Sequence, residues 1–209
     1  MHLWFQAMWN IASQKYGANA LGIQRVLGLG SYHTAWEWLH KLRCAMVRPG
    51  REKLSGVVEV DETYVGGQKL GKRGRGAVGK ALVVIAIEDK NVLGFRRVRL
   101  GRVEDASGDS LTKFIEDNVE AGSTIRTDGW KGKGYNGLID KGYEHVIQRE
   151  MGKIGEEMLP LAHRIASLMK RWMLGTYQGA IRVQHLNYYL DEYTFRFNRR
   201  TSASRGKLF

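Results

Sequence analysis

The feature that most restricts the fold of this chain is a near-continuous apolar run, Ala81–Ile87 (ALVVIAI). A short run of this kind is typical of a strand buried inside a sheet. An earlier segment, Gly56–Val65 (GVVEVDETYV), alternates apolar and polar residues as a half-buried strand does. The two segments together predict a sheet at the centre of the protein.

The segments that follow predict further elements in a definite order. Val92–Leu100 is expected to be a third strand, paired with the apolar run through a turn near Asp89–Asn91. A helix is expected next, at Ala106–Val119, and then short strands at Ser123–Thr127 and His145–Ile147. Helical periodicity returns in two last segments, Leu159–Leu174 and His185–Phe197. This order describes an α/β domain and matches a ribonuclease H-like mixed sheet with flanking helices, in which the first three strands are antiparallel.

Residues 1–50 read as helical and end at Pro49–Gly50. An apolar face formed by Leu21, Ile23, Val26 and Leu27 stops at Gly28, and Ser31 is a good N-cap for a second helix. Two helices joined by a Gly-containing turn fit a helix-turn-helix, and a plain helical hairpin fits the same pattern. We therefore expect a small helical segment, 1–50, before a catalytic domain that spans 51–209.

The charge balance points to a polyanionic partner. Lys and Arg number 33 against 21 Asp and Glu, which gives a net charge of +12. A field of that sign attracts nucleic acid or an anionic membrane surface. No apolar stretch approaches the roughly 20 residues of a spanning helix, and the N-terminus does not resemble a signal peptide. The single cysteine, Cys44, excludes an internal disulfide and a thiolate zinc site within this chain. We expect a cytoplasmic, nucleoid-associated protein with no membrane partner.

A basic, glycine-rich segment, Gly66–Lys80, separates the first two predicted strands. It cannot pack a core and is expected to be an exposed loop. A solvated connector is the alternative to a role in DNA binding. The loop residues expected to contact DNA are Lys69, Lys72, Arg73, Arg75 and Lys80.

Two aspartates follow the pattern of a metal site. Asp61 is expected at the end of the first core strand, in VEVDET, and Asp128 at the end of the later short strand, STIRT. If these strands are neighbours in one sheet, the carboxylates converge at one edge. Such a pair can hold two divalent ions that activate an attacking oxygen and stabilise a leaving oxygen at phosphorus.

The third member of the site is expected on the helix after the sheet. His163 and Lys170 are seven residues apart, so two helical turns return them to nearly the same face. His163 is a candidate metal ligand or substrate contact, and Lys170 a candidate phosphate contact. Glu156, seven residues before His163, is the alternative third carboxylate if the helix begins that early.

At this point the residues match a known family. The chain resembles the ISXO-like insertion-sequence transposases, a branch of the DDE superfamily with a ribonuclease H-like core. The resemblance rests on the stretches Gly22–Arg43, VEVDETYVGG (Val58–Gly67), IRTDGWKG (Ile125–Gly132), His163–Ala180 and His185–Ser202. It implies that Asp61 is the first catalytic acid, that Asp128 is the second, and that the third position falls on His163. The spacing of 35 residues from Asp128 to His163 is typical of the superfamily, and Lys170 takes the expected basic position. Arg171, beside it, is assigned to DNA contact.

The resemblance also implies an activity and its partners. It implies metal-dependent DNA cleavage and strand transfer with Mg²⁺ or Mn²⁺, two ions in all. The expected partners are double-stranded DNA, as element ends and target, and further copies of the chain on that DNA. The cysteine-rich zinc ribbon usual at the start of such transposases is missing here. Two further interpretations stay open: a truncated or domesticated derivative that binds DNA without cutting it, and a nuclease for RNA–DNA hybrids.

Overall fold

The computed structural model describes residues 1–66, 80–89, 97–128, 135, 137–148, 158–178 and 181–204. The chain divides into a helical unit, formed by residues 1–51 and 171–209, and a sheet unit, formed by residues 52–170. The expected division into 1–50 and 51–209 differs from this one, because the C-terminal residues group with the N-terminal helices. One helix, α5 (Pro160–Tyr177), begins in the sheet unit and ends in the helical unit.

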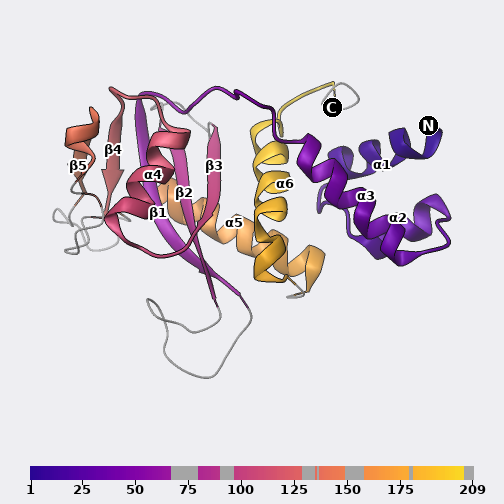
Figure 1. Ribbon diagram of the computed structural model, residues 1–209. Helices are drawn as coiled ribbons and strands as arrows, with labels where there is room; N and C mark the ends of the chain where they lie inside the picture. Colours follow the sequence, from indigo (N-terminus) through magenta and orange to yellow (C-terminus); the bar gives the residue numbers. More distant parts are fainter. Residues whose placement is uncertain are drawn as a thin grey trace. The chain divides into compact units, whose positions relative to one another are not determined.

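Within its described residues, the sheet unit contains one sheet of five strands (Figure 1). They are β1 (Val57–Val65), β2 (Ala81–Asp89), β3 (Val98–Val103), β4 (Thr124–Thr127) and β5 (Glu144–Ile147). Their order across the sheet is β3-β2-β1-β4-β5, with β1, β2 and β3 antiparallel in turn and β4 and β5 parallel to β1. This order and these directions are those of a ribonuclease H-like fold, so the predicted fold class is confirmed.

Helices cover both faces of the sheet unit (Figure 1). On one face α4 (Gly108–Asn118) packs Leu111, Phe114 and Ile115 against apolar residues of β1 and β2 that include Val58 and Val60. The other face carries the alternate residues of β1, Glu59 and Asp61, and α5 lies against it through contacts described below. β2 is buried along nearly its whole length, as its apolar run predicts, because it lies between β1 and β3 with a helix on either face.

The third strand ends later in the chain than its sequence pattern indicates. β3 covers Val98–Val103 and pairs with β2 from Leu82↔Val103 to Ile87↔Val98. Gly101 and Arg102 interrupt the apolar pattern, yet both still pair with β2. Gly101 lies against the ring of Phe114 on α4, where a larger side chain would collide with it. Residues 90–96, which include most of the expected turn and the first five residues of the expected strand, lie outside the described residues.

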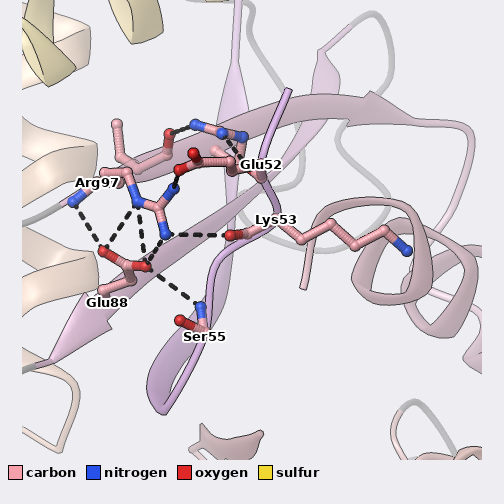
Figure 2. A network of polar contacts seen from close by, with 7 residues as sticks. Glu52, Lys53, Ser55, Glu88 and Arg97 are labelled. Atoms are coloured by element: carbon pink, nitrogen blue, oxygen red, sulfur yellow. Dashed lines mark hydrogen bonds and ion pairs between the residues drawn. The ribbon is translucent and has the colours of Figure 1, made fainter. Parts of the chain in front are cut away.

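The sheet unit also contains a polar network that holds the chain as it enters β1 (Figure 2). The Glu88 carboxylate, 2% exposed, accepts hydrogen bonds from the backbone N–H groups of Ser55 and Arg97. The Arg97 guanidinium returns bonds to Glu88, to the Lys53 carbonyl and to Glu52. These bonds tie residues 52–55 to the end of β2 and the start of β3.

Elsewhere in the sheet unit, a short helical turn, η2 (Ile139–Lys141), leads into β5.

The helical unit contains α1 (His2–Ser13), α2 (Ala20–Leu27), α3 (Tyr32–Ala45), the short η3 (Val183–His185) and α6 (Leu186–Asn198). Gly28 ends α2 in the left-handed conformation, and the Ser31 hydroxyl caps α3 by accepting from the Thr34 N–H. Of the predicted apolar face of α2, only Ile23 and Leu27 are buried. Leu21 and Val26 are exposed. Because the helix turns by about 100° per residue, they point away from the face that Ile23 and Leu27 share. No helix within the described residues is long and apolar enough to cross a membrane.

A buried ion pair joins the two chain segments of the helical unit. The Arg43 Nε of α3 lies 2.8 Å from the Glu192 carboxylate of α6, with side chains 2% and 0% exposed. The Tyr177 hydroxyl donates to the same carboxylate oxygen and accepts from Arg43. These contacts explain why residues 171–209 group with the N-terminal helices.

Candidate functional site

The site begins with Asp61 on β1 and His163 on α5. The backbone N–H of Glu62 donates to Asp61 Oδ1 at 2.8 Å, which restrains the orientation of the carboxylate. The other oxygen, Oδ2, lies 3.5 Å from His163 Nε2, and the two side chains are 15% and 44% exposed. The structure therefore brings the first and third expected site residues together at a surface that solvent can reach.

Asp61 lies in the middle of β1 and not at its end as expected, and Asp128 directly follows β4, the neighbouring strand. β1 and β4 run parallel and pair as far as Glu59↔Arg126. Continued two residues past its last printed pair, this register would put Asp128 opposite Asp61, and side-chain alternation would put both on the face that carries Glu59. Both carboxylates also add to the rise in the pKa of the Tyr135 hydroxyl, after burial and Glu62, so each lies within electrostatic range of that group.

Glu59 joins the strand of Asp61 to the helix of His163. Its carboxylate, on a residue 2% exposed, accepts the backbone N–H groups of Leu161 and Ala162 on one oxygen, at 2.9 and 3.0 Å. Burial raises the pKa of Glu59, and the two N–H donors oppose that rise. Glu59 thus satisfies donors of the first turn of α5 that have no acceptor within the helix.

Two lysines supply positive charge near the carboxylates. Lys170 lies two turns after His163 on α5, and Lys80 directly precedes β2. Burial and the nearby Lys80 ammonium lower the pKa of Lys170, whereas the Asp61 carboxylate acts in the opposite direction. Lys170, Lys80 and Asp61 therefore lie close enough to influence one another, which suits binding of an anionic substrate beside the carboxylates. Arg171 is exposed on the same helix.

A buried tyrosine adjoins the site and was not expected from the sequence. The Tyr135 hydroxyl, on a residue 4% exposed, donates to Glu62 Oε1 at 2.9 Å. Burial and the Glu62 carboxylate raise the pKa of Tyr135 well above its usual value, so the hydroxyl keeps its proton. Tyr135 lies in a glycine- and lysine-rich segment without periodicity, so no local pattern marks it as buried or places it near Glu62.

The residues fit a divalent cation in part. Two ligand atoms that each lie about 2.1 Å from an ion, with a right angle between the two bonds, are about 3 Å apart. The observed distance from Asp61 Oδ2 to His163 Nε2, 3.5 Å, is near this value. Across the described ranges, no three His, Cys, Asp or Glu side chains form a ready metal-binding group. The set Asp61, Asp128 and His163 therefore stays a prediction, which the contact between Asp61 and His163 supports.

Several expected site residues lie outside the described residues. They are Lys69, Lys72, Arg73 and Arg75 of the basic loop, and Glu156, the alternative third carboxylate.

The fold and the site define an α/β domain of the ribonuclease H-like class with carboxylates at adjacent strand positions. The chain belongs to the ISXO2-like transposase domain family, whose model matches residues 53–198. The structure of the BIV integrase catalytic core domain is similar to this chain, with 12% sequence identity and a TM-score of 0.43 over 68% of this chain and 83% of that chain. A simian T-cell lymphotropic virus intasome in complex with the PP2A regulatory subunit B56 gamma has 12% identity and a TM-score of 0.41, over 82% of this chain and 64% of that chain. No curated protein matches the chain.

Proposed function

We propose that this chain is the transposase of a bacterial insertion sequence, which cleaves phosphodiester bonds at the element ends and joins the freed ends to target DNA. The observation that carries the proposal is the contact between Asp61 of β1 and His163 of α5, beside the register position of Asp128. Membership of a transposase family supports the choice of DNA over other phosphodiesters.

Asp61, Asp128 and His163 would hold the divalent cations on which DDE transposases depend, Mg²⁺ or Mn²⁺ and two in number. Bound there, such ions supply activation of the attacking oxygen and stabilisation of the leaving oxygen. The Glu62 N–H keeps the Asp61 carboxylate in place before any ion arrives. Imidazole is a weaker ligand than carboxylate for Mg²⁺ and suits Mn²⁺ better, so His163 favours the softer ion.

The basic residues would hold the DNA backbone. Lys170 and Lys80 repel each other when no anion is present, and a phosphate between them would relieve that repulsion. Arg171 and the loop residues Lys69, Lys72, Arg73 and Arg75 would add contacts that do not depend on base sequence. The proposal includes assembly of several copies on DNA, since two element ends must be joined in one reaction.

DNA that flanks the chain's own gene is the substrate for the test. The protein should cut this DNA at the element ends when Mn²⁺ or Mg²⁺ is added. Asp61→Asn keeps the side-chain shape and should lower the cutting rate by more than about 100-fold. Mutation of a residue that only hydrogen-bonds to a metal ligand already lowers activity by about 10- to 100-fold, and loss of the ligand itself should cost more. Asp117→Asn, at an exposed position on α4, is the matched control and should cut like the parent.

Binding must be measured beside cutting. Both variants should shift the same DNA in a gel, because neither change removes a basic residue. A parent protein that shifts DNA but never cuts it with either metal would favour the non-catalytic derivative. Preferential cutting of RNA–DNA hybrids would favour a ribonuclease H-like nuclease.

A further inference from the structure

One strand and one helix of the sheet unit meet at two successive points. Glu59 accepts the N–H groups of Leu161 and Ala162, and two residues later Asp61 meets the imidazole of His163. The three helix positions are consecutive in the chain. The first contact therefore lies directly beside the second on both elements.

The first contact controls the geometry of the second. Successive residues of a helix are rotated by about 100° and raised by 1.5 Å, so the direction of His163 depends on the rotation and the height of the first turn. One oxygen of Glu59 accepts two adjacent N–H groups, which restricts both quantities. The side chain of Glu59 has little freedom to move, because the residue is 2% exposed.

We propose that Glu59 is a positioning residue: by holding the first turn of α5 it places the His163 imidazole against Asp61. The inference rests on the proposed function, since the placement of His163 matters for chemistry only if the site binds a cation. The competing role for Glu59 is purely electrostatic, with its negative charge attracting the cation from two residues away.

Two conservative substitutions separate these roles. Glu59→Gln removes the charge but keeps a carbonyl oxygen that can accept both N–H groups. Glu59→Asp keeps the charge but shortens the side chain by one carbon–carbon bond, about 1.5 Å, so the oxygen no longer reaches α5. If Glu59 positions the helix, Glu59→Asp weakens Mn²⁺ binding by about 10- to 100-fold and Glu59→Gln by much less. The reverse order would overturn the proposal.

Mn²⁺ binding is read directly from the electron paramagnetic resonance signal of the free ion, without DNA and without turnover. Glu88→Gln is the matched control, because Glu88 is also 2% exposed and also accepts two backbone N–H groups, from Ser55 and Arg97 (Figure 2). It should lower thermal stability while leaving Mn²⁺ affinity at the parent value. A loss of affinity in Glu88→Gln as large as in Glu59→Asp would overturn the proposal, since it would reflect general destabilisation.

The His163→Ala background shows whether Glu59 acts through His163. In that background Glu59→Asp should cost little further Mn²⁺ affinity. An equal loss in both backgrounds would overturn the proposal.

A metal-free measurement keeps the two proposals apart. The nuclear Overhauser effect between the His163 ring and the Asp61 side chain should persist in Glu59→Gln and disappear in Glu59→Asp. If the parent binds no Mn²⁺ and cuts no DNA, the proposed function fails, and this signal still decides whether Glu59 positions His163. Persistence of the signal in both variants would overturn the positioning role.

Discussion

The buried Arg43–Glu192 pair should dominate the stability of the helical unit. Glu192 has no exposed side-chain surface and accepts hydrogen bonds from Arg43, Tyr177 and Arg196. Burial opposes the charged form of Arg43, yet Glu192 outweighs it and the pKa of Arg43 is raised. In a Glu192→Ala variant the guanidinium would stay charged and buried, with the Tyr177 hydroxyl and the Ala18 carbonyl as its remaining acceptors. Removal of one partner from a buried pair costs about 3–5 kcal/mol of unfolding free energy.

Tryptophan fluorescence during urea unfolding is the suitable assay. Five of the six tryptophans fall within the residues of the helical unit, so the signal reports mainly on that unit. The five are Trp4, Trp9, Trp36, Trp38 and Trp172. The expected result is a fall of about 3–5 kcal/mol for Glu192→Ala relative to the parent.

The double variant Arg43→Met/Glu192→Leu provides the control. It removes both charges and keeps apolar volume, and such replacements of buried ion pairs are often neutral or stabilising. It should therefore be more stable than Glu192→Ala by several kcal/mol. A loss below about 1 kcal/mol for Glu192→Ala, the range of exposed ion pairs, would refute the reasoning.

Three further outcomes are expected. His163→Ala should reduce DNA cutting far more than DNA binding in a gel-shift assay, and His163→Glu should raise the ratio of Mg²⁺- to Mn²⁺-dependent cutting, because a carboxylate is a harder ligand. Equal cutting by His163→Ala and the parent with both metals would remove His163 from the site. Joint replacement of Lys72, Arg73 and Arg75 by Gln should flatten the slope of log affinity against log salt by about 2–3, and an unchanged slope would mean that the loop does not contact phosphate. Burial, together with neighbouring positive charge, lowers the pKa of His40 to about 4 from 6.5, so the parent should lose stability as the pH falls from 6.5 to 4. The unfolding free energy of His40→Phe, measured with urea at each pH, should not show that loss. A pH profile identical to that of the parent would contradict the role of His40.

Local patterns were enough to predict most of the sheet unit. Strands β1 and β2 follow directly from alternation and from the apolar run, since both patterns involve residues a few positions apart. β3 was expected to end at Leu100, because Gly101 and Arg102 break its pattern, but it continues to Val103 through pairing with β2. The ribonuclease H-like fold followed from the order of the elements.

The residues of the candidate site differ in how far sequence could lead to them. Asp61 and Asp128 stand out because each lies on or just after a recognisable strand. Glu59 was visible as a neighbour of Asp61 on the same face, but its bonds to α5 join residues that are 102 and 103 positions apart. No sequence pattern marks Tyr135 as a site residue, because the segment from which it contacts Glu62 has no periodicity.

The types and approximate limits of the helices and strands, and the placing of Asp61 on one strand and Asp128 after another, are properties of short stretches of chain. Near-neighbour sterics and the spacing of apolar residues determine them, and both can be read in the printed sequence. Which stretches meet is a different question, because an apolar or charged face shows that a residue needs a partner but not which partner it finds. Arg43 and Glu192 are 149 positions apart, and nothing near either residue indicates the other. Such pairings, like the contact of Asp61 with His163, depend on the free energy of packing the whole chain, so the folded structure was needed to identify them.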